Sequence, residues 1–268
     1  MLKTDFKSNR NSVMKKISIA IPFYNRSNLI HEALNNILED ERISEIIIQD
    51  DFSSDSEFNF ISESFKGVEK IKIKRNEKNL GAYFNKLEAV KSCSGEWVIL
   101  LDSDNYLFTS YIDSVFKESP WDADYCYIAD EMLANGNKYP WGRCDGCWDH
   151  GRFGRSPIDF NQIEDIWNKD YGIDGLLNAG NYFFNRENYI RRASMIINES
   201  SEEFLNPYAS DCIAFMYYWL SDGGKIKILE NAEYYHRMHS GSLWGSLAAE
   251  SSRYSAAIRN RFRNEKIK

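Results

Sequence analysis

Short apolar runs alternate with helical patterns through the first half of the chain. An alternating run of isoleucines at residues 17–21 ends at Pro22, which predicts a strand, because proline cannot continue a hydrogen-bond ladder. Apolar positions at residues 29–38 then recur at the spacing of a helix, with Asn28 as the expected cap. The chain therefore opens with a strand followed by a helix.

The same order repeats along the chain. Strands that alternate with helices predict a mainly parallel sheet with helices on both faces. The predicted fold class is therefore α/β, with a Rossmann-like central sheet. In such a sheet, ligands bind at the carboxyl ends of the strands. The further strands are predicted at residues 45–49, 71–73, 97–101 and 124–129, and the further helices at residues 56–65 and 82–93.

Polar clusters follow three of these strands. The apolar run at residues 97–101 leads directly into Asp102-Ser103-Asp104. Two carboxylates one residue apart suit a hard divalent cation that also binds phosphate oxygens, although Asp and Ser are common in simple turns as well. Residues 22–25 and Asp50-Asp51 end two other strands of the same sheet. Three clusters at one edge favour a metal and diphosphate site.

The second half of the chain begins with a less regular segment. Residues 130 to about 172 lose periodicity and are rich in Gly, Trp and Asp, which is typical of a segment that carries specificity. Its aromatic residues lie beside carboxylates, a combination that suits sugars, and a local minicore is the alternative. Trp141, Trp148 and the nearby Asp174 are the candidates there. The regular pattern resumes after this segment. It predicts a strand at 181–184, helices at 187–197 and 211–220, and the last strands near 226–228 and 234–235.

Composition narrows the range of partners. The 268 residues have a formal net charge of -7 and 43% hydrophobic content, which fits one globular domain with an elaborated second half. The acidic balance argues against nucleic acid as the main partner, because phosphate binding needs a large basic surface. Since the sequence shows neither a signal-peptide pattern nor an apolar stretch of membrane-span length, we expect a cytoplasmic location and free thiols at its five cysteines.

Two smaller features have more than one interpretation. Cys144 and Cys147, followed by His150, fit a zinc or redox site, but no second ligand pair accompanies them and they lie in a loop-like stretch. The basic segment at residues 253–268 could contact an anionic membrane at its surface, and a solvated helix is the alternative.

The polar motifs, taken in order, resemble a known family. The motifs are Ile-Pro-Phe-Tyr-Asn-Arg at 21–26, Asp-Asp-Phe-Ser-Ser-Asp at 50–55, Asn-Leu-Gly at 79–81, Gly-Glu-Trp at 95–97 and Asp-Ser-Asp at 102–104. A later Arg-Met-His-Ser-Gly-Ser follows at residues 237–242. The whole set is similar to the inverting glycosyltransferases of family 2, which have the GT-A fold, and the last motif looks like the C-terminal element of that family. The resemblance is strong over residues 15–115 and looser over residues 175–245.

The resemblance implies a nucleotide-diphosphate sugar as the donor, most often a UDP-sugar. The acceptor would be a hydroxyl of a saccharide or a lipid-linked glycan, in the synthesis of a surface polysaccharide or lipopolysaccharide. Tyr24 would stack on the nucleotide base, and Asp51, in preference to Asp50, would accept a hydrogen bond from it. Strand-end packing is the alternative for Tyr24, and a turn or cap role is the alternative for Asp50.

The resemblance also implies a metal-dependent reaction. Asp104 would be the chief protein ligand of Mn²⁺ or Mg²⁺, Asp102 would face the ribose or the metal, and His239 would complete the metal shell or touch the diphosphate. Arg237 would clamp the diphosphate, and Lys86 would supply a phosphate contact. A packed strand histidine and a surface charge are the alternatives for His239 and Arg237. The remaining donor-side candidates are Pro22, Asn25, Asn79, Gly81 and Ser103.

Inverting transfer needs a carboxylate that takes the proton of the attacking hydroxyl. Asp211 opens the helical stretch in which the family places this base, and a simple helix N-cap is its alternative role. The family often has an acidic residue just before this Asp, whereas Ser210 stands here. Asp174, Glu202 and Glu203 therefore remain rivals for the base.

The predicted organisation has four parts. Residues 1–16 form a polar extension, residues 17–129 bind the donor, residues 130–248 bind the acceptor, and residues 249–268 form a basic tail. Two other activities fit the motifs less well, because a phosphatase of the Asp-x-Asp type would have its pair after the first strand and a nucleotidyltransferase would have a glycine-rich basic loop there. A non-catalytic domain that binds a nucleotide sugar or a carbohydrate is a further alternative.

Overall fold

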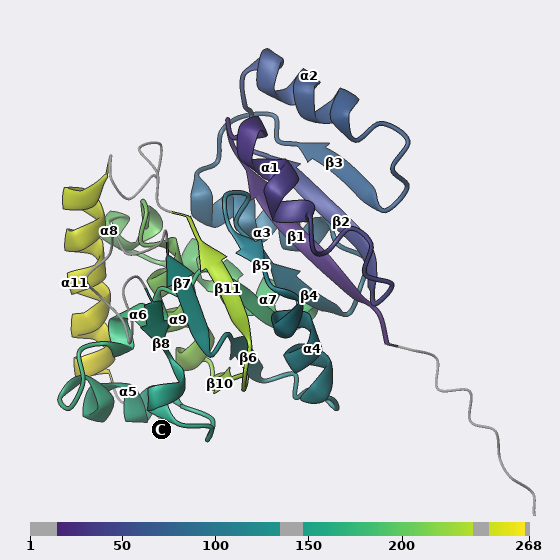
Figure 1. Ribbon diagram of the computed structural model, residues 1–268. Coiled ribbons are helices and arrows are strands. Elements are labelled where there is room, and N and C mark those ends of the chain that lie inside the picture. The colour runs from purple at the N-terminus through teal and green to yellow at the C-terminus, as the bar shows by residue number, and fades with distance from the viewer. Residues whose placement is uncertain (1–14, 135–146, 238–246, 266–268) are drawn as a thin grey trace, which may run out of the picture.

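The computed structural model describes residues 15–134, 147–237 and 247–265. Within these residues a seven-stranded sheet forms the centre of the molecule, with the strand order β10-β6-β9-β4-β1-β2-β3 (Figure 1). Its strands are β1 (Ile17–Phe23), β2 (Ile43–Asp50), β3 (Ile71–Arg75), β4 (Trp97–Leu100), β6 (Tyr125–Ile128), β9 (Tyr182–Asn185) and β10 (Lys225–Ile228).

The central sheet is mostly parallel, as its sequence pattern predicts. The strand β9 is antiparallel to both of its neighbours, β4 and β6, and its Phe183 pairs with Ile99 on one side and Tyr127 on the other. The other neighbouring pairs in this sheet are parallel. The predicted α/β fold class is confirmed, and one reversed strand separates β6 and β10 from the rest of the sheet.

Helices cover both faces of this sheet. Because side chains alternate along β1, Ala20 packs toward one layer of helices and Ile19 toward the other. The first layer contains α3 (Ala82–Ser92), α7 (Arg186–Ala193) and α9 (Asp211–Ser221). The second contains α1 (Ser27–Leu34), α2 (Asp55–Ser64) and α4 (Thr109–Lys117).

A second, smaller sheet lies beside the first. It consists of β5 (Tyr106–Leu107), β11 (Glu233–His236), β7 (Glu131–Ala134) and β8 (Cys147–Asp149), in that order. The expectation that residues 130–172 are irregular is wrong in part, because β7, β8 and the helix α5 (Phe160–Trp167) lie there. The strands β7 and β8 are too short to show periodicity, whereas α5 buries Phe160, Ile163 and Trp167 at helical spacing and has a capping box formed by Asp159 and Gln162.

The remaining helices frame one side of the molecule. Residues near the C-terminus form α11 (Ala248–Asn264), which packs against α9 and α5 through the buried Tyr254, Ile258 and Phe262. The shorter elements are η2 (Gly151–Phe153), α6 (Ile173–Leu177), η3 (Ser194–Asn198) and α8 (Glu202–Leu205). In the described part of the chain, no helix combines the length and apolar character that a membrane crossing requires.

One helix boundary differs from its prediction. The expected cap Asn28 lies inside α1, which begins at Ser27. The Ser27 N–H donates to Glu57 Oε2 at 2.8 Å, so a side chain of α2 satisfies this end of the helix. A cap supplied by another helix has no local sequence signal.

Candidate active site

A cavity of about 580 Å³ opens at the carboxyl ends of the central strands. The predicted clusters after β1, β2 and β4 all contribute to it, as a parallel sheet requires. Residues of α3, α6, α9, α11 and the small sheet form most of the remaining wall. In the part of the chain that the structure describes, the charged residues that line the cavity are Arg26, Asp51, Lys86, Asp102, Asp104, Asp174, Asp211, Arg237 and Arg259.

The strand β4 delivers the Asp102-Ser103-Asp104 cluster to the cavity. The Asp102 N–H donates to Asn181 Oδ1 at 3.1 Å, which ties the start of the cluster to the chain just before β9. The Asp104 carboxylate forms an ion pair with Arg26, and its backbone carbonyl accepts from Arg237 Nε at 3.2 Å. Arg237 also pairs with Glu32. Two guanidinium groups therefore lie beside the second aspartate, where a diphosphate would need positive charge.

Asp50 and Asp51 have different surroundings, although they are neighbours. The Asp50 side chain is fully buried, accepts from the Ser53 N–H and pairs with Arg75, and it does not line the cavity. Burial raises the pKa of Asp50, and the contacts with Ser53 and Arg75 oppose this shift. Asp51 lines the cavity. Of the two candidates, only Asp51 is therefore placed to contact a ligand there.

Asp51 also holds the turn that precedes α3. Its Oδ1 accepts from the Leu80 N–H at 2.8 Å and its Oδ2 from the Gly81 N–H at 2.9 Å, while its backbone carbonyl accepts from Asn79 Nδ2. Gly81 has a φ of 81°, which favours glycine at this position. The turn thus exposes Asn79 and Gly81 to the cavity.

The residues after β1 have two different roles: some line the cavity, and Asn25 joins the ends of two strands. Pro22 and Tyr24 line the cavity, and the Tyr24 ring is 48% exposed, as a ring that stacks on a ligand would be. Asn25 does not line the cavity. Its N–H donates to Ser53 Oγ at 2.9 Å and its Oδ1 accepts from the Ser54 N–H at 3.0 Å, so it ties the ends of β1 and β2 together.

Lys86 is buried in the cavity wall, between two carboxylates. Its Nζ lies 2.9 Å from Asp102 Oδ1 and 2.7 Å from Asp211 Oδ2. Burial disfavours the charged ammonium, but the two carboxylates more than offset this effect and raise the pKa of Lys86 well above its usual value. Burial likewise raises the pKa of Asp102, and Lys86 opposes that shift. Lys86 thus joins the first aspartate of the strand-end cluster to the candidate base.

Asp211 is the first residue of α9 and is not its N-cap. The N-cap is Ser210, whose hydroxyl bonds to Ser251 and Ser255 in α11 instead of capping the helix. The Asp211 side chain is 9% exposed, lines the cavity and pairs with Lys86. The alternative role of Asp211 as a simple cap therefore finds no support in the hydrogen bonds around it.

The opposite wall contains the acceptor candidates that the structure describes. Asp174 accepts from Trp167 Nε1 at 2.8 Å and forms a bidentate ion pair with Arg259 of α11. The Trp148 ring lies against Gly175, where any Cβ would overlap it. Arg259 was not a sequence candidate, because nothing local indicates that a basic residue near the C-terminus reaches this wall.

Other candidates lie elsewhere. Glu202 and Glu203 are exposed on α8 and do not line the cavity, so that among the described residues Asp174 and Asp211 are the carboxylates on the acceptor side. Trp141, His239 and Cys144 lie outside the described residues. His150 is fully buried, with Nδ1 3.0 Å from the Ala129 carbonyl oxygen, and burial lowers its pKa to about 4.

The donor side fits a divalent cation in the chemistry of its ligands. Asp102 and Asp104 supply carboxylate oxygens, which Mn²⁺ and Mg²⁺ both accept. Among the described residues, no three His, Cys, Asp or Glu side chains are grouped so as to hold a metal ion. A cation bound to these two aspartates would therefore complete its shell with phosphate oxygens, water or residues outside the described ranges.

Comparison with known proteins identifies the family. The pattern described as "Glycosyl transferase family 2" matches residues 18–171, more than half of the chain. The chain belongs to this family. It is a glycosyltransferase, and its donor is a nucleotide sugar. The strand-end clusters that contribute to the cavity lie within the matched residues.

Relatives of this family 2 member come from several bacteria. The glycosyltransferase GlyG of Streptococcus pneumoniae serotype 4 is 24% identical over 233 residues, which cover 85% of this chain and 72% of GlyG. The GalNAc(5)-diNAcBac-PP-undecaprenol beta-1,3-glucosyltransferase of Campylobacter jejuni is 31% identical over 108 residues, which cover 40% of this chain and 35% of that protein.

Solved structures share the fold. The Staphylococcus aureus TarS structure of residues 1–349 in complex with UDP-GlcNAc matches with a TM-score of 0.63 and 18% identity, covering 94% of this chain and 68% of that one. A structure of GalNAc-T7 with UDP, GalNAc and Mn²⁺ matches with a TM-score of 0.55 and 14% identity, covering 85% of this chain and 45% of that one. The family 2 chain thus has the GT-A architecture of TarS.

Proposed function

We propose that this enzyme transfers a sugar, with inversion, from a UDP-sugar to a hydroxyl of a saccharide or lipid-linked glycan. The observation that carries the proposal is the single cavity in which Asp51, the Asp102 to Asp104 cluster and Asp211 meet. Asp51 would accept a hydrogen bond from the nucleotide base, the Asp102 to Asp104 cluster would hold a metal ion at the diphosphate, and Asp211 would take the proton of the attacking hydroxyl. The relatives support the proposed substrates, since TarS was solved with UDP-GlcNAc and the Campylobacter relative is named for an undecaprenol-linked acceptor.

The donor would bind along the strand ends. Tyr24 would stack on the uracil while Asp51 accepts its N–H, and the diphosphate would lie near Arg26 and Arg237. Bound Mn²⁺ or Mg²⁺ would be held by Asp104 and Asp102 and would stabilise the negative charge of the leaving nucleotide. Of the other donor candidates, Asn79 and Gly81 would form the part of the wall next to Asp51, to which both bond. Asp50 would contribute indirectly, through its ion pair with Arg75.

Asp211 would act as the general base. Its Oδ2 is bound to Lys86, so the carboxylate is held in place while the acceptor hydroxyl approaches and gives up its proton. Asp174 would instead bind the acceptor: Trp167 and Arg259 hold its carboxylate in place, and the lone pair that remains on Oδ2 can accept from a saccharide hydroxyl. A saccharide ring between Trp148 and the Asp174–Arg259 pair would have an aromatic face and two polar partners.

We further propose that the enzyme works in the cytoplasm, in surface glycan synthesis, at the face of the membrane where a lipid-linked acceptor is available. In α11, Arg259 and Arg261 form ion pairs with Asp174 and Glu199 within the chain. Arg253 and Arg263 are exposed and could contact anionic lipids.

The test separates donor binding from catalysis. Wild-type enzyme with Mn²⁺ is expected to release UDP from one member of a UDP-sugar panel when acceptor is present. Asp211→Asn should lower kcat by about 10² to 10⁴-fold, the usual contribution of a general base, while calorimetry shows near wild-type UDP affinity. The variant exchanges a charged for a neutral acceptor opposite Lys86, so we expect a stability loss of about 1–2 kcal/mol.

Asp174→Asn is the matched control, since it makes the same change on the opposite wall of the cavity. It should raise the acceptor KM and retain most of kcat. Wild-type kcat in Asp211→Asn, combined with loss of kcat in Asp174→Asn, would exchange the two assignments. UDP binding without turnover on any tested acceptor would instead favour a binding module.

A further inference from the structure

A small void lies beneath the Lys86–Asp211 pair, on the side of the pair that faces the core. It has a volume of about 10 Å³, close to the smallest space that holds one water molecule. Its lining combines Lys86, Asp211 and Cys212 with three tyrosines of the surrounding core, Tyr83, Tyr182 and Tyr189. A polar void at this position is unusual, because the helices and strands around it pack mainly through aromatic side chains.

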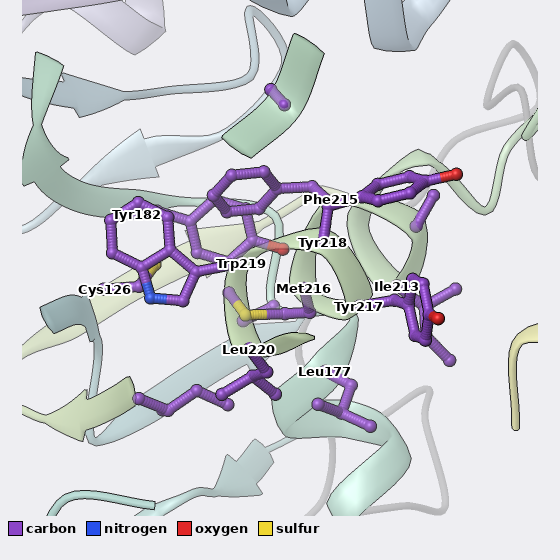
Figure 2. Close-up of a cluster of buried hydrophobic side chains, with 14 of the residues drawn as sticks. Cys126, Leu177, Tyr182, Ile213, Phe215, Met216, Tyr217, Tyr218, Trp219 and Leu220 are labelled. Atoms are coloured by element: carbon purple, nitrogen blue, oxygen red, sulfur yellow. The ribbon is translucent and has the colours of Figure 1, made fainter. Parts of the chain in front are cut away.

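Tyr182 has an unsatisfied hydroxyl at this void. Its side chain is 1% exposed and packs on Phe215 of α9, with ring centroids 5.3 Å apart (Figure 2). Within the described part of the chain, its hydroxyl makes no hydrogen bond of good geometry, although the Gly180 backbone and the Cys212 thiol lie close to it. Leaving a buried hydroxyl unpaired costs about 1–3 kcal/mol. By contrast, the Tyr83 hydroxyl at the same void donates to the Ala193 carbonyl oxygen at 2.9 Å.

A water molecule in the void would satisfy this hydroxyl. Buried water needs two to four polar partners, and Tyr182, the Asp211 carboxylate and the Cys212 thiol all border the space. The Lys86 ammonium already has Asp102 and Asp211 as close partners and Cys212 Sγ at 3.7 Å. A water between Tyr182 and Asp211 would therefore hold the carboxylate from below, while Lys86 holds it from the donor side.

We propose that Tyr182 is a positioning residue for Asp211 and acts through one water molecule bound in this void. The inference rests on the proposed role of Asp211 as the base. With both contacts, Asp211 is fixed in the orientation that faces the acceptor. Without the Tyr182 contact, the carboxylate keeps Lys86 and the weak Cys212 thiol contact, both at Oδ2, and samples other orientations, which lowers the fraction of productive encounters.

The experiment compares two Tyr→Phe variants. Tyr182→Phe removes only the hydroxyl, and we expect kcat to fall about tenfold while the donor KM and UDP affinity stay unchanged. Tyr111→Phe is the matched control, because Tyr111 of α4 is also fully buried with an unpartnered hydroxyl, but lies in the other core layer. It should keep wild-type kcat and an equal or higher thermal midpoint.

A double mutant tests whether the effect passes through the base. In an Asp211→Asn background, Tyr182→Phe should cause no further loss of kcat. Wild-type kcat in Tyr182→Phe would overturn the inference while leaving the base assignment intact, provided that Asp211→Asn is inactive. Wild-type kcat in Asp211→Asn would overturn both.

A crystal structure of the wild-type enzyme gives a result that does not depend on how the variants fold. It should show an ordered water within hydrogen-bond distance of both Tyr182 Oη and Asp211. A dry void, with the Tyr182 hydroxyl turned to the Cys212 sulfur, would contradict the proposal.

Discussion

Replacing Asp51 by Ala should affect both the fold and donor binding, and the structure allows the two effects to be estimated separately. The Asp51 carboxylate accepts from the Leu80 N–H, the Gly81 N–H and Asn76 Nδ2, at 2.8, 2.9 and 2.8 Å. Each hydrogen bond to a charged group contributes about 1.5–3 kcal/mol, but Gly81 also bonds to Asn79, and water reaches the exposed side of the turn. We therefore expect a loss of about 2–4 kcal/mol in the free energy of unfolding.

The loss in donor binding has a different origin. Without Asp51 the uracil loses its charged acceptor, and the turn that carries Asn79 and Gly81 loses its anchor. We expect UDP affinity to fall by about 1–3 kcal/mol, or roughly 5- to 150-fold. Titration calorimetry with UDP, well below the thermal midpoint of the variant, measures the loss of affinity. Denaturant unfolding measures the loss in the free energy of unfolding.

Asp50→Ala is the control, since Asp50 is buried, pairs with Arg75 and does not line the cavity. It should lower stability and leave UDP affinity within about twofold of wild type. Unchanged affinity in Asp51→Ala, or a larger loss of affinity in Asp50→Ala, would refute Asp51 as the group that binds the base.

Three further predictions follow from other parts of the structure. Asp104→Ala, or EDTA treatment of the wild type, should lower turnover at least 10²-fold, and full activity in EDTA would exclude a metal requirement. Burial lowers the pKa of His150 to about 4, from about 6.5 in the unfolded chain, so only the unfolded state gains a proton at His150 as pH falls from 7 to 4.5. The free energy of unfolding should therefore drop by roughly 2–3 kcal/mol over this range. Denaturant titrations should show this dependence in the wild type and a flatter one in His150→Gln. Gly175→Ala should displace the Trp148 ring and raise the acceptor KM with little change in donor KM, whereas equal KM values for wild type and variant would remove Trp148 from the acceptor site.

The donor side of the site could be predicted from sequence because parallel strands bring their carboxyl ends to one edge. Asp51 and the Asp102 to Asp104 cluster each follow an apolar run, so their positions follow from the strands alone. Strand ends do not determine which of two adjacent aspartates faces the ligand. That depends on the Ser53 and Arg75 contacts, which turn Asp50 inward.

The acceptor side could be predicted only in part. The family resemblance points to Asp211, at the start of the helical stretch in which the family places its base, but the pairing of Asp211 with Lys86 joins α9 to α3 and has no local signal. Arg259 reaches the cavity because α11 packs on α9 and α5, so a segment interpreted as a basic tail supplies part of the wall. Contacts between helices far apart in sequence depend on packing, which periodicity does not encode.

The most direct test of the account is a crystal structure of the enzyme with UDP and Mn²⁺. The uracil should contact Tyr24 and Asp51, the diphosphate should lie by Asp104 and Arg237 with the metal on Asp104, and Asp211 should face open space on the acceptor side. A nucleotide bound elsewhere, or one in this cavity with Asp211 turned away from the sugar position, would contradict the account.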